Sequence, residues 1–194
     1  MMAQVIDLRN NTPIKGERYF VDTNVWFWTT YVASKNMQFP DPPEQYQVSE
    51  YPRFLERALN DGAKLCHCAL MFAELANIIE NKELDIYKSV NNKPYFAKKE
   101  FRNIEKERTT VLNEIQVAWN AISKMSACIE VNVDSSFIAG AQSIMEKGRV
   151  DPFDSFYVQT MRKNKIDYVI TDDHDFVTVS NQIVVTSNPR ALRR

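Results

Sequence analysis

The sequence predicts an α/β fold in which a parallel β-sheet is flanked by helices. Two features of the 194 residues point to this fold: five short apolar runs with the length of buried strands, and stretches of helical periodicity between them. Strands that alternate with helices are typical of parallel sheets. There is no internal repeat or low-complexity tract, so a single domain over residues 1–194 is the simplest account.

The elements follow one another at regular spacing. The predicted strands are residues 19–21, 64–66, 128–131, 168–170 and 183–185. The predicted helices are residues 69–80, 134–147 and 154–163, each with apolar side chains at helical spacing along one side.

Two segments interrupt this alternation and predict helical insertions. Residues 36–60 begin with a proline-rich stretch, FPDPPEQY, which indicates an exposed loop leading into a helix over residues 50–60. Residues 82–125 form the larger insertion. From Phe96 onward their apolar residues recur at helical spacing, which predicts one long amphipathic helix or two helices in tandem.

Composition limits the possible functions. A net charge of −1 excludes a protein that coats nucleic acid through bulk attraction, so any polyanion must bind local patches. Three cysteines are too few for a disulfide framework. No apolar stretch approaches the ~20 residues that cross a bilayer, and the first residues lack the apolar core of a signal peptide. We therefore expect a cytoplasmic protein without a membrane partner.

Several classes of site are disfavoured. The chain has two histidines and four glycines, which argues against a histidine-driven hydrolase and against glycine-rich phosphate loops. Cys66, His67 and Cys68 suggest zinc, but no second half of a tetrahedral site follows. A short strand is the preferred interpretation of these three residues.

Acidic residues stand at special positions. Asp22 ends the first strand and, taken alone, is best explained as a helix cap. Glu74 lies inside an apolar helical stretch, beside Leu75 and Ile78, where a carboxylate is rarely buried without a partner. We expect that partner to be a cation.

A second acidic group surrounds the next helix and strand. Asp151 fits an N-cap and Asp154 the third helical position, so capping explains both. Capping does not explain the acids of TDDHD, which directly follow the strand at residues 168–170.

These acids are expected to meet. The carboxyl ends of parallel strands share one edge of a sheet, where Asp22 and Asp172 end their strands while Glu74 and Asp154 lie on neighbouring helices. Carboxylates ~4 Å apart repel by about 1 to 4 kcal/mol per pair, so without a metal at least one should keep its proton to high pH. An all-oxygen site selects Mg²⁺ or Mn²⁺.

The sequence resembles the PIN-domain family of metal-dependent ribonucleases, which includes VapC-type toxins. The blocks VDTNVW, AEL within FAELANII, and DPFDSFYVQTMRKNKIDYVITDDHDF carry the resemblance. It implies a three-layer fold with a five-stranded parallel sheet in the order 3-2-1-4-5. It also implies a catalytic, metal-binding quartet: Asp22, Glu74, Asp154 and Asp172. The implied supporting residues are Asn24, Thr171 and Asp175, with Asp151 and Asp173 as further candidates.

The implied function is endonucleolytic hydrolysis of RNA by water that one or two Mg²⁺ or Mn²⁺ ions activate, leaving a 5′-phosphate and a 3′-hydroxyl. The chain would then be a candidate toxin with an antitoxin partner, although it is longer than such toxins. Other readings are a non-catalytic PIN-fold binding module and a flap-type DNA nuclease. A haloacid dehalogenase phosphatase lacks support, because DTNVW stands where its DxDx[TV] motif would be.

Substrate and partner contacts can be proposed from charge and aromaticity. The candidate RNA-binding residues are Lys98, Lys99, Arg102, Arg190, Arg193 and Arg194. Acids interleave with the first three, which favours a solvated helix face there and makes the tail the better candidate. We expect Phe27 and Tyr31 to pack inside, and Trp26 or Trp28 to stack on a base or to meet the second copy in a homodimer.

Overall fold

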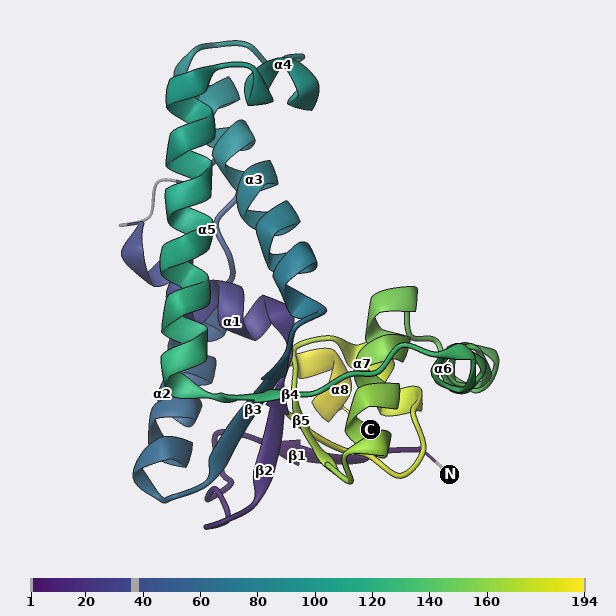
Figure 1. Ribbon diagram of the computed structural model, residues 1–194. Helices are drawn as coiled ribbons and strands as arrows, with labels where there is room; N and C mark the ends of the chain where they lie inside the picture. Colours follow the sequence, from purple (N-terminus) through teal and green to yellow (C-terminus); the bar gives the residue numbers. More distant parts are fainter. Residues whose placement is uncertain (1, 36–38, 194) are drawn as a thin grey trace.

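The computed structural model describes residues 2–35 and 39–193, and its centre is a six-stranded parallel sheet in the order β1-β6-β5-β2-β3-β4 (Figure 1). The strands are β1 (Gln4–Asp7), β2 (Arg18–Val21), β3 (Lys64–Cys68), β4 (Ala127–Ile129), β5 (Tyr168–Ile170) and β6 (Ile183–Thr186).

The fold class is confirmed, and the number of strands is corrected from five to six. The five predicted strands lie in the predicted order, and β1 adds a parallel strand beside β6, with Val5 opposite Val184. The run QVID has only two apolar residues and gives a weak local signal. Pairing with β6, a contact distant in sequence, makes it a strand.

Helices cover both faces of the sheet. They are α1 (Thr23–Thr30), α2 (Gln45–Asn60), α3 (Met71–Val90), α4 (Lys98–Arg102), α5 (Glu105–Met125), α6 (Ser135–Lys147), α7 (Pro152–Lys163) and α8 (Pro189–Leu192), with 3-10 turns η1 (Val32–Ser34) and η2 (His174–Thr178). Figure 1 shows α3 and α5 rising side by side from the sheet with α4 at their far end, and α6 and α7 on the other side. Within the described part of the chain, no helix combines the length and apolar character needed to cross a membrane.

Both insertions are helical, with boundaries that differ from the prediction. Helix α2 begins at Gln45 rather than at residue 50, and α4 and α5 are two helices in tandem. Helix α3 continues past residue 80 to Val90, because its buried acids find cations: Arg102 Nε lies 2.6 Å from Glu80, and Lys35 Nζ lies 2.7 Å from Glu83.

The aromatic group of α1 belongs entirely to the core. Phe27 and Tyr31 are buried as expected and stack with their ring centroids 5.2 Å apart. Trp26 and Trp28 are buried too, so the expectation that one of them meets a base or a partner chain is wrong. The reason is that α1 packs against α2, α3 and α5 and has little free surface.

Candidate active site

Three of the four predicted acids converge where β2 ends and where α3 and α7 begin. Asp22 and Asp154 are 4% and 7% exposed, and Glu74 lies in the first turn of α3. Asp22 occupies the N-cap position of α1, but its side chain makes no capping hydrogen bond. Its Oδ2 accepts a 2.7 Å hydrogen bond from Thr171 Oγ1. Helix capping therefore does not account for this buried carboxylate.

The pKa values indicate that these carboxylates face one shared space. Burial raises the pKa of Asp154 to about 9, and the charges of Asp22, Asp151, Asp173 and Glu74 add to the effect. Burial likewise raises the pKa of Asp22 to about 7, followed by the charge of Glu74. No Lys or Arg of the described ranges forms a salt bridge with Asp22 or Asp154. The described protein therefore supplies no basic partner for these acids, and their mutual repulsion is relieved by holding a proton.

Glu74 is held by hydroxyl groups. Its Oε2 accepts a 2.5 Å hydrogen bond from Thr23 Oγ1 and another from the Tyr157 hydroxyl. Burial raises the pKa of Tyr157 well above its usual range, so this phenol stays protonated and keeps donating. Within the described chain Glu74 is thus held by two neutral donors, and the cation expected beside it stays a prediction. Sequence analysis identified neither residue as a partner, and Tyr157 gave no signal beyond its place one helical turn after Asp154.

Asp172 is not brought to this group. Its Oδ1 accepts a 2.8 Å hydrogen bond from the Tyr51 hydroxyl. Its Oδ2 accepts hydrogen bonds from Gln47 Nε2 at 2.7 Å and from the Tyr46 hydroxyl at 3.1 Å. All three donors come from α2, so the Asp172 carboxylate ties the end of β5 to that helix.

Asp173 takes the position expected for Asp172. The chain bends at Asp172, and Thr171 Oγ1 accepts a 2.9 Å hydrogen bond from the Asp173 backbone N–H, which holds Asp173 next to the Thr171 side chain. Thr171 Oγ1 reaches Asp22, and the charge of Asp173 raises the pKa values of both Asp22 and Asp154. The bend at Asp172 sets this assignment, and no strand pattern in TDD indicates it.

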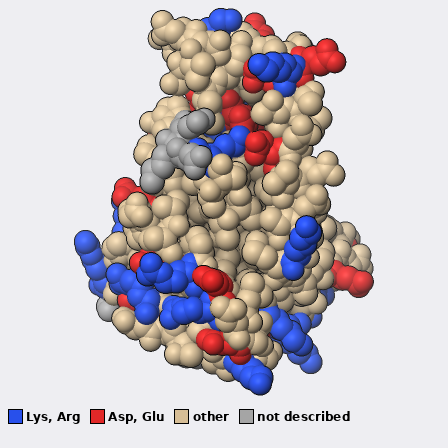
Figure 2. Space-filling view, turned by 90° about the vertical axis from the view of Figure 1, so that its left-hand side faces the viewer, with Lys and Arg blue, Asp and Glu red and all other residues tan. Residues whose placement is uncertain are grey.

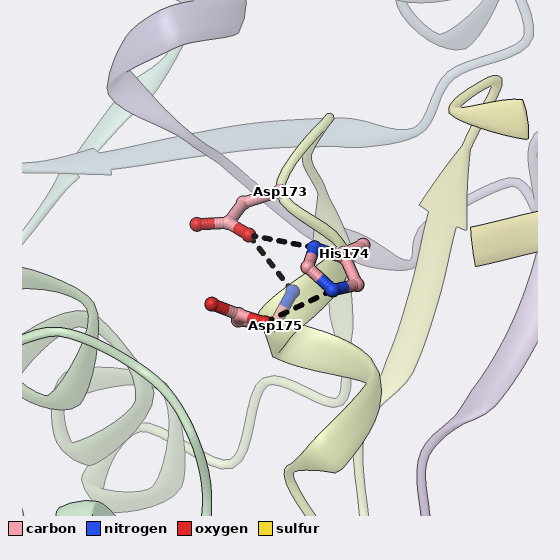
Figure 3. Close-up of side chains that lie close together, drawn as sticks. All are labelled: Asp173, His174 and Asp175. Atoms are coloured by element: carbon pink, nitrogen blue, oxygen red, sulfur yellow. Dashed lines mark hydrogen bonds and ion pairs between the residues drawn. The ribbon is translucent and has the colours of Figure 1, made fainter. Parts of the chain in front are cut away.

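Asp173 also belongs to a local group with His174 and Asp175 (Figure 3). His174 Nε2 lies 3.3 Å from Asp175 Oδ1, and Asp173 Oδ1 accepts a 2.8 Å hydrogen bond from the Asp175 backbone N–H. Among the described residues, this is the group whose three potential ligand atoms all lie within 4.8 Å of one another. The carboxylates of Asp22, Glu74 and Asp154 do not form such a group of three, as expected of like charges with no cation between them.

Two other supporting candidates differ in their surroundings. Asp151 is the N-cap of α7, where its Oδ1 accepts a 2.9 Å hydrogen bond from the Asp154 backbone N–H. This bond fixes the first turn of α7 and with it the position of Asp154. Asn24 is exposed at the start of α1, and its amide has no hydrogen-bond partner in the part of the chain that is described.

The predicted RNA-binding cations fall into two groups. Lys98 and Arg102 are engaged with Glu80, at 3.0 and 2.6 Å, at the end of the helical insertion remote from the sheet (Figure 1), while Lys99 is exposed on the same short helix. Arg190 and Arg193 line a cleft beside Asp173. Arg194 lies outside the described residues.

The residues present fit a divalent cation. The acids around Asp22 offer carboxylate oxygens, the donors that Mg²⁺ and Mn²⁺ prefer. The raised pKa values of Asp22 and Asp154 show that their ionised forms are unfavourable here, and a bound divalent ion would stabilise those forms. His174 adds a nitrogen at the exposed edge, which suits Mn²⁺ better than Mg²⁺.

Comparison with known proteins agrees with this geometry. A family model described as the PIN domain matches residues 48–182, more than half of the chain, and this range includes Glu74, Asp154 and Asp173. PIN domains are in general nucleases. No curated protein matches the chain.

A solved structure shares the fold. The crystal structure of VapBC2 from Rickettsia felis, bound to a DNA fragment from their promoter, is similar with a TM-score of 0.50 and 11% sequence identity. The similarity covers 87% of this chain and 98% of the solved one. Because the PIN domain model matches residues 48–182, the chain belongs to the PIN domain family.

Proposed function

We propose that this protein is a divalent-metal-dependent endoribonuclease whose metal ligands are Asp22, Glu74, Asp154 and Asp173. One observation carries the proposal: Asp22 and Asp154 are buried next to further acids, with no cation of the described chain beside them. Such an arrangement destabilises the folded protein unless an ion joins it. Strongly perturbed carboxylates of this kind are typical of functional sites.

The surrounding residues would hold the ligands in place. Thr171 orients Asp22 through its hydroxyl, and Thr23 and Tyr157 orient Glu74. One or two Mg²⁺ or Mn²⁺ ions bound to these acids would polarise the scissile phosphate and balance the charge that develops on it.

Cleavage of RNA by single-site variants tests the proposal. We expect Asp22→Asn, Asp154→Asn and Asp173→Asn to abolish cleavage of single-stranded RNA in Mg²⁺ or Mn²⁺. The matched control is Asp167→Asn, an exposed acid before β5, which should cleave like the wild type. Cleavage in excess EDTA, or full activity in Asp154→Asn, would refute the assignment.

Substrate competition separates RNA cleavage from the alternatives. RNA and flap-structured DNA, carrying different labels, are incubated together with the protein in Mn²⁺. Faster cleavage of the flap would identify a DNA nuclease. Cleavage of neither, combined with Mn²⁺ failing to raise the melting temperature, would indicate a binding module without a metal site.

We further propose that an antitoxin protein is the partner of this nuclease. The solved structure that shares the fold is a VapBC complex, which supports the proposal only as an analogy. If a small open reading frame neighbours the gene, its product should copurify with this chain and inhibit RNA cleavage. A nuclease unaffected by that product would act outside a toxin–antitoxin pair.

A further inference from the structure

A cleft of about 660 Å³ lies directly beside the acidic site. Its wall includes Tyr46 of α2, Asp173 and His174 of the turn after β5, and Arg190 and Arg193 at α8. Its volume falls within the range of ligand sites, roughly 300 to 1,000 Å³. Because Asp173 also faces Asp22 and Asp154, a molecule in this cleft would adjoin the acidic site.

The two arginines of the cleft have free guanidinium groups. Both are exposed, and neither guanidinium has an acceptor among the described residues. This distinguishes them from Arg102, which is bound to Glu80, and from Arg9, which is bound to Asp7. Figure 2 shows that Lys and Arg gather on the lower part of one face, so a chain with net charge −1 still has local cationic surface. The cleft arginines are therefore available to an anion.

One of the three acids that line the cleft, Asp172, is already satisfied. Asp172 accepts hydrogen bonds from Tyr46, Gln47 and Tyr51, and these donors offset its charge. The hydrogen bond from the Tyr46 hydroxyl to Asp172 also limits the movement of the half-buried Tyr46 ring in the cleft wall. Glu44 at the rim has no such set of donors and opposes an incoming anion.

We propose that this cleft binds one unpaired nucleotide of the RNA next to the phosphate that is cut. Its phosphate would lie against Arg190 and Arg193, and its base would stack on Tyr46, a contact that tolerates any base. The proposal rests on the proposed nuclease function and deepens it. The substrate would be single-stranded at this position, because a stacked base in a cleft cannot also be paired.

Binding of a fluorescein-labelled hexauridylate in EDTA, followed by fluorescence anisotropy, tests the cleft. Arg190→Gln and Arg193→Gln should each weaken binding about fivefold or more and reduce the slope of log K against log salt by about 0.7. Tyr46→Ala should weaken binding at least about fivefold, while Tyr46→Phe, which keeps the ring and loses only the hydroxyl bond to Asp172, should bind more tightly than Tyr46→Ala. Glu44→Gln should tighten binding.

The control is Lys106→Gln, an exposed cation in the first turn of α5 at the remote end of the helical insertion, which should leave binding unchanged. Thermal unfolding of each variant checks that the fold is kept. The proposal is overturned if the wild type does not bind the hexamer, or if the arginine variants behave like Lys106→Gln.

Because EDTA removes metal ions from the binding assay, the measured affinity does not depend on whether the protein cleaves RNA. If the cleft variants lose RNA binding but the wild type does not cleave RNA in Mn²⁺, the proposed nuclease function is refuted and the proposed nucleotide site is supported. If the cleft variants cleave RNA normally, with unchanged binding and KM, only the proposed nucleotide site is refuted.

Discussion

Asp154→Asn should change how the stability of the metal-free protein depends on pH. The pKa of Asp154 in the folded chain is about 9 against an ordinary value of 3.8, chiefly because of burial. Between about pH 5 and pH 7 the folded chain keeps this proton while the unfolded chain has lost it. The group therefore costs nothing below about pH 4, and its cost grows as the pH rises toward the folded pKa.

The magnitude follows from proton linkage. One proton held only by the folded state lowers the free energy of unfolding by up to about 1.4 kcal/mol for each pH unit. Asparagine does not titrate, so Asp154→Asn should lose this dependence. Over about two pH units, the free energy of unfolding of the variant should gain roughly 2 to 3 kcal/mol relative to the wild type.

Urea unfolding in EDTA, followed by circular dichroism at about pH 5, 6 and 7, measures this difference. Asp167→Asn is again the control, and its stability should run parallel to that of the wild type because this side chain is exposed. Parallel curves for Asp154→Asn and the wild type would show that Asp154 ionises normally, and the reasoning about the buried acids would fail.

Three further substitutions probe the scaffold through urea unfolding at about pH 7. Gly140→Ala should cost less than about 1 kcal/mol, because the atom its Cβ would meet at 2.2 Å, Gln159 Nε2, ends a flexible side chain that can turn away; a larger loss would mean that Gln159 is held in place. Tyr51→Phe should cost about 1 to 3 kcal/mol by leaving Asp172 Oδ1 and the Thr171 carbonyl without a donor and the Ser187 backbone N–H without an acceptor, and an unchanged unfolding midpoint would contradict the account of α2. Lys35→Met should cost about 1.5 to 3 kcal/mol, because this side chain bridges two carboxylates at 2.7 Å, and a variant as stable as the wild type would show that the bridge contributes nothing.

Periodicity was sufficient to predict most of the fold. The apolar runs that became β2, β3, β5 and β6 and the amphipathic stretches that became α6 and α7 are long or apolar enough to be recognised locally. The edge strand β1 and the end of α3 were missed. The first depends on pairing with β6, and the second on cations from distant segments, so both are set by tertiary contacts.

The candidate site could be predicted where the sequence showed which helix or strand end carries each acid. Asp22, Glu74 and Asp154 lie on elements whose type was predicted correctly, and the structure brings them together. Asp172 was expected in the site because it stands at the end of the strand, but the chain bends at this residue and its carboxylate is bound by side chains of α2, which no local pattern specifies. The hydroxyl donor from Tyr157 comes from how α3 and α7 pack, which no local pattern specifies.

The central claim is that Asp22, Glu74, Asp154 and Asp173 together hold a divalent cation, and calorimetric titration of the metal-free protein with Mn²⁺ tests it most directly. We predict that the wild type binds Mn²⁺, that Asp173→Asn weakens binding by more than about tenfold, and that Asp172→Asn, whose partners are side chains of α2, binds nearly as well as the wild type. No Mn²⁺ binding by the wild type, or loss of binding in Asp172→Asn with normal binding in Asp173→Asn, would contradict it.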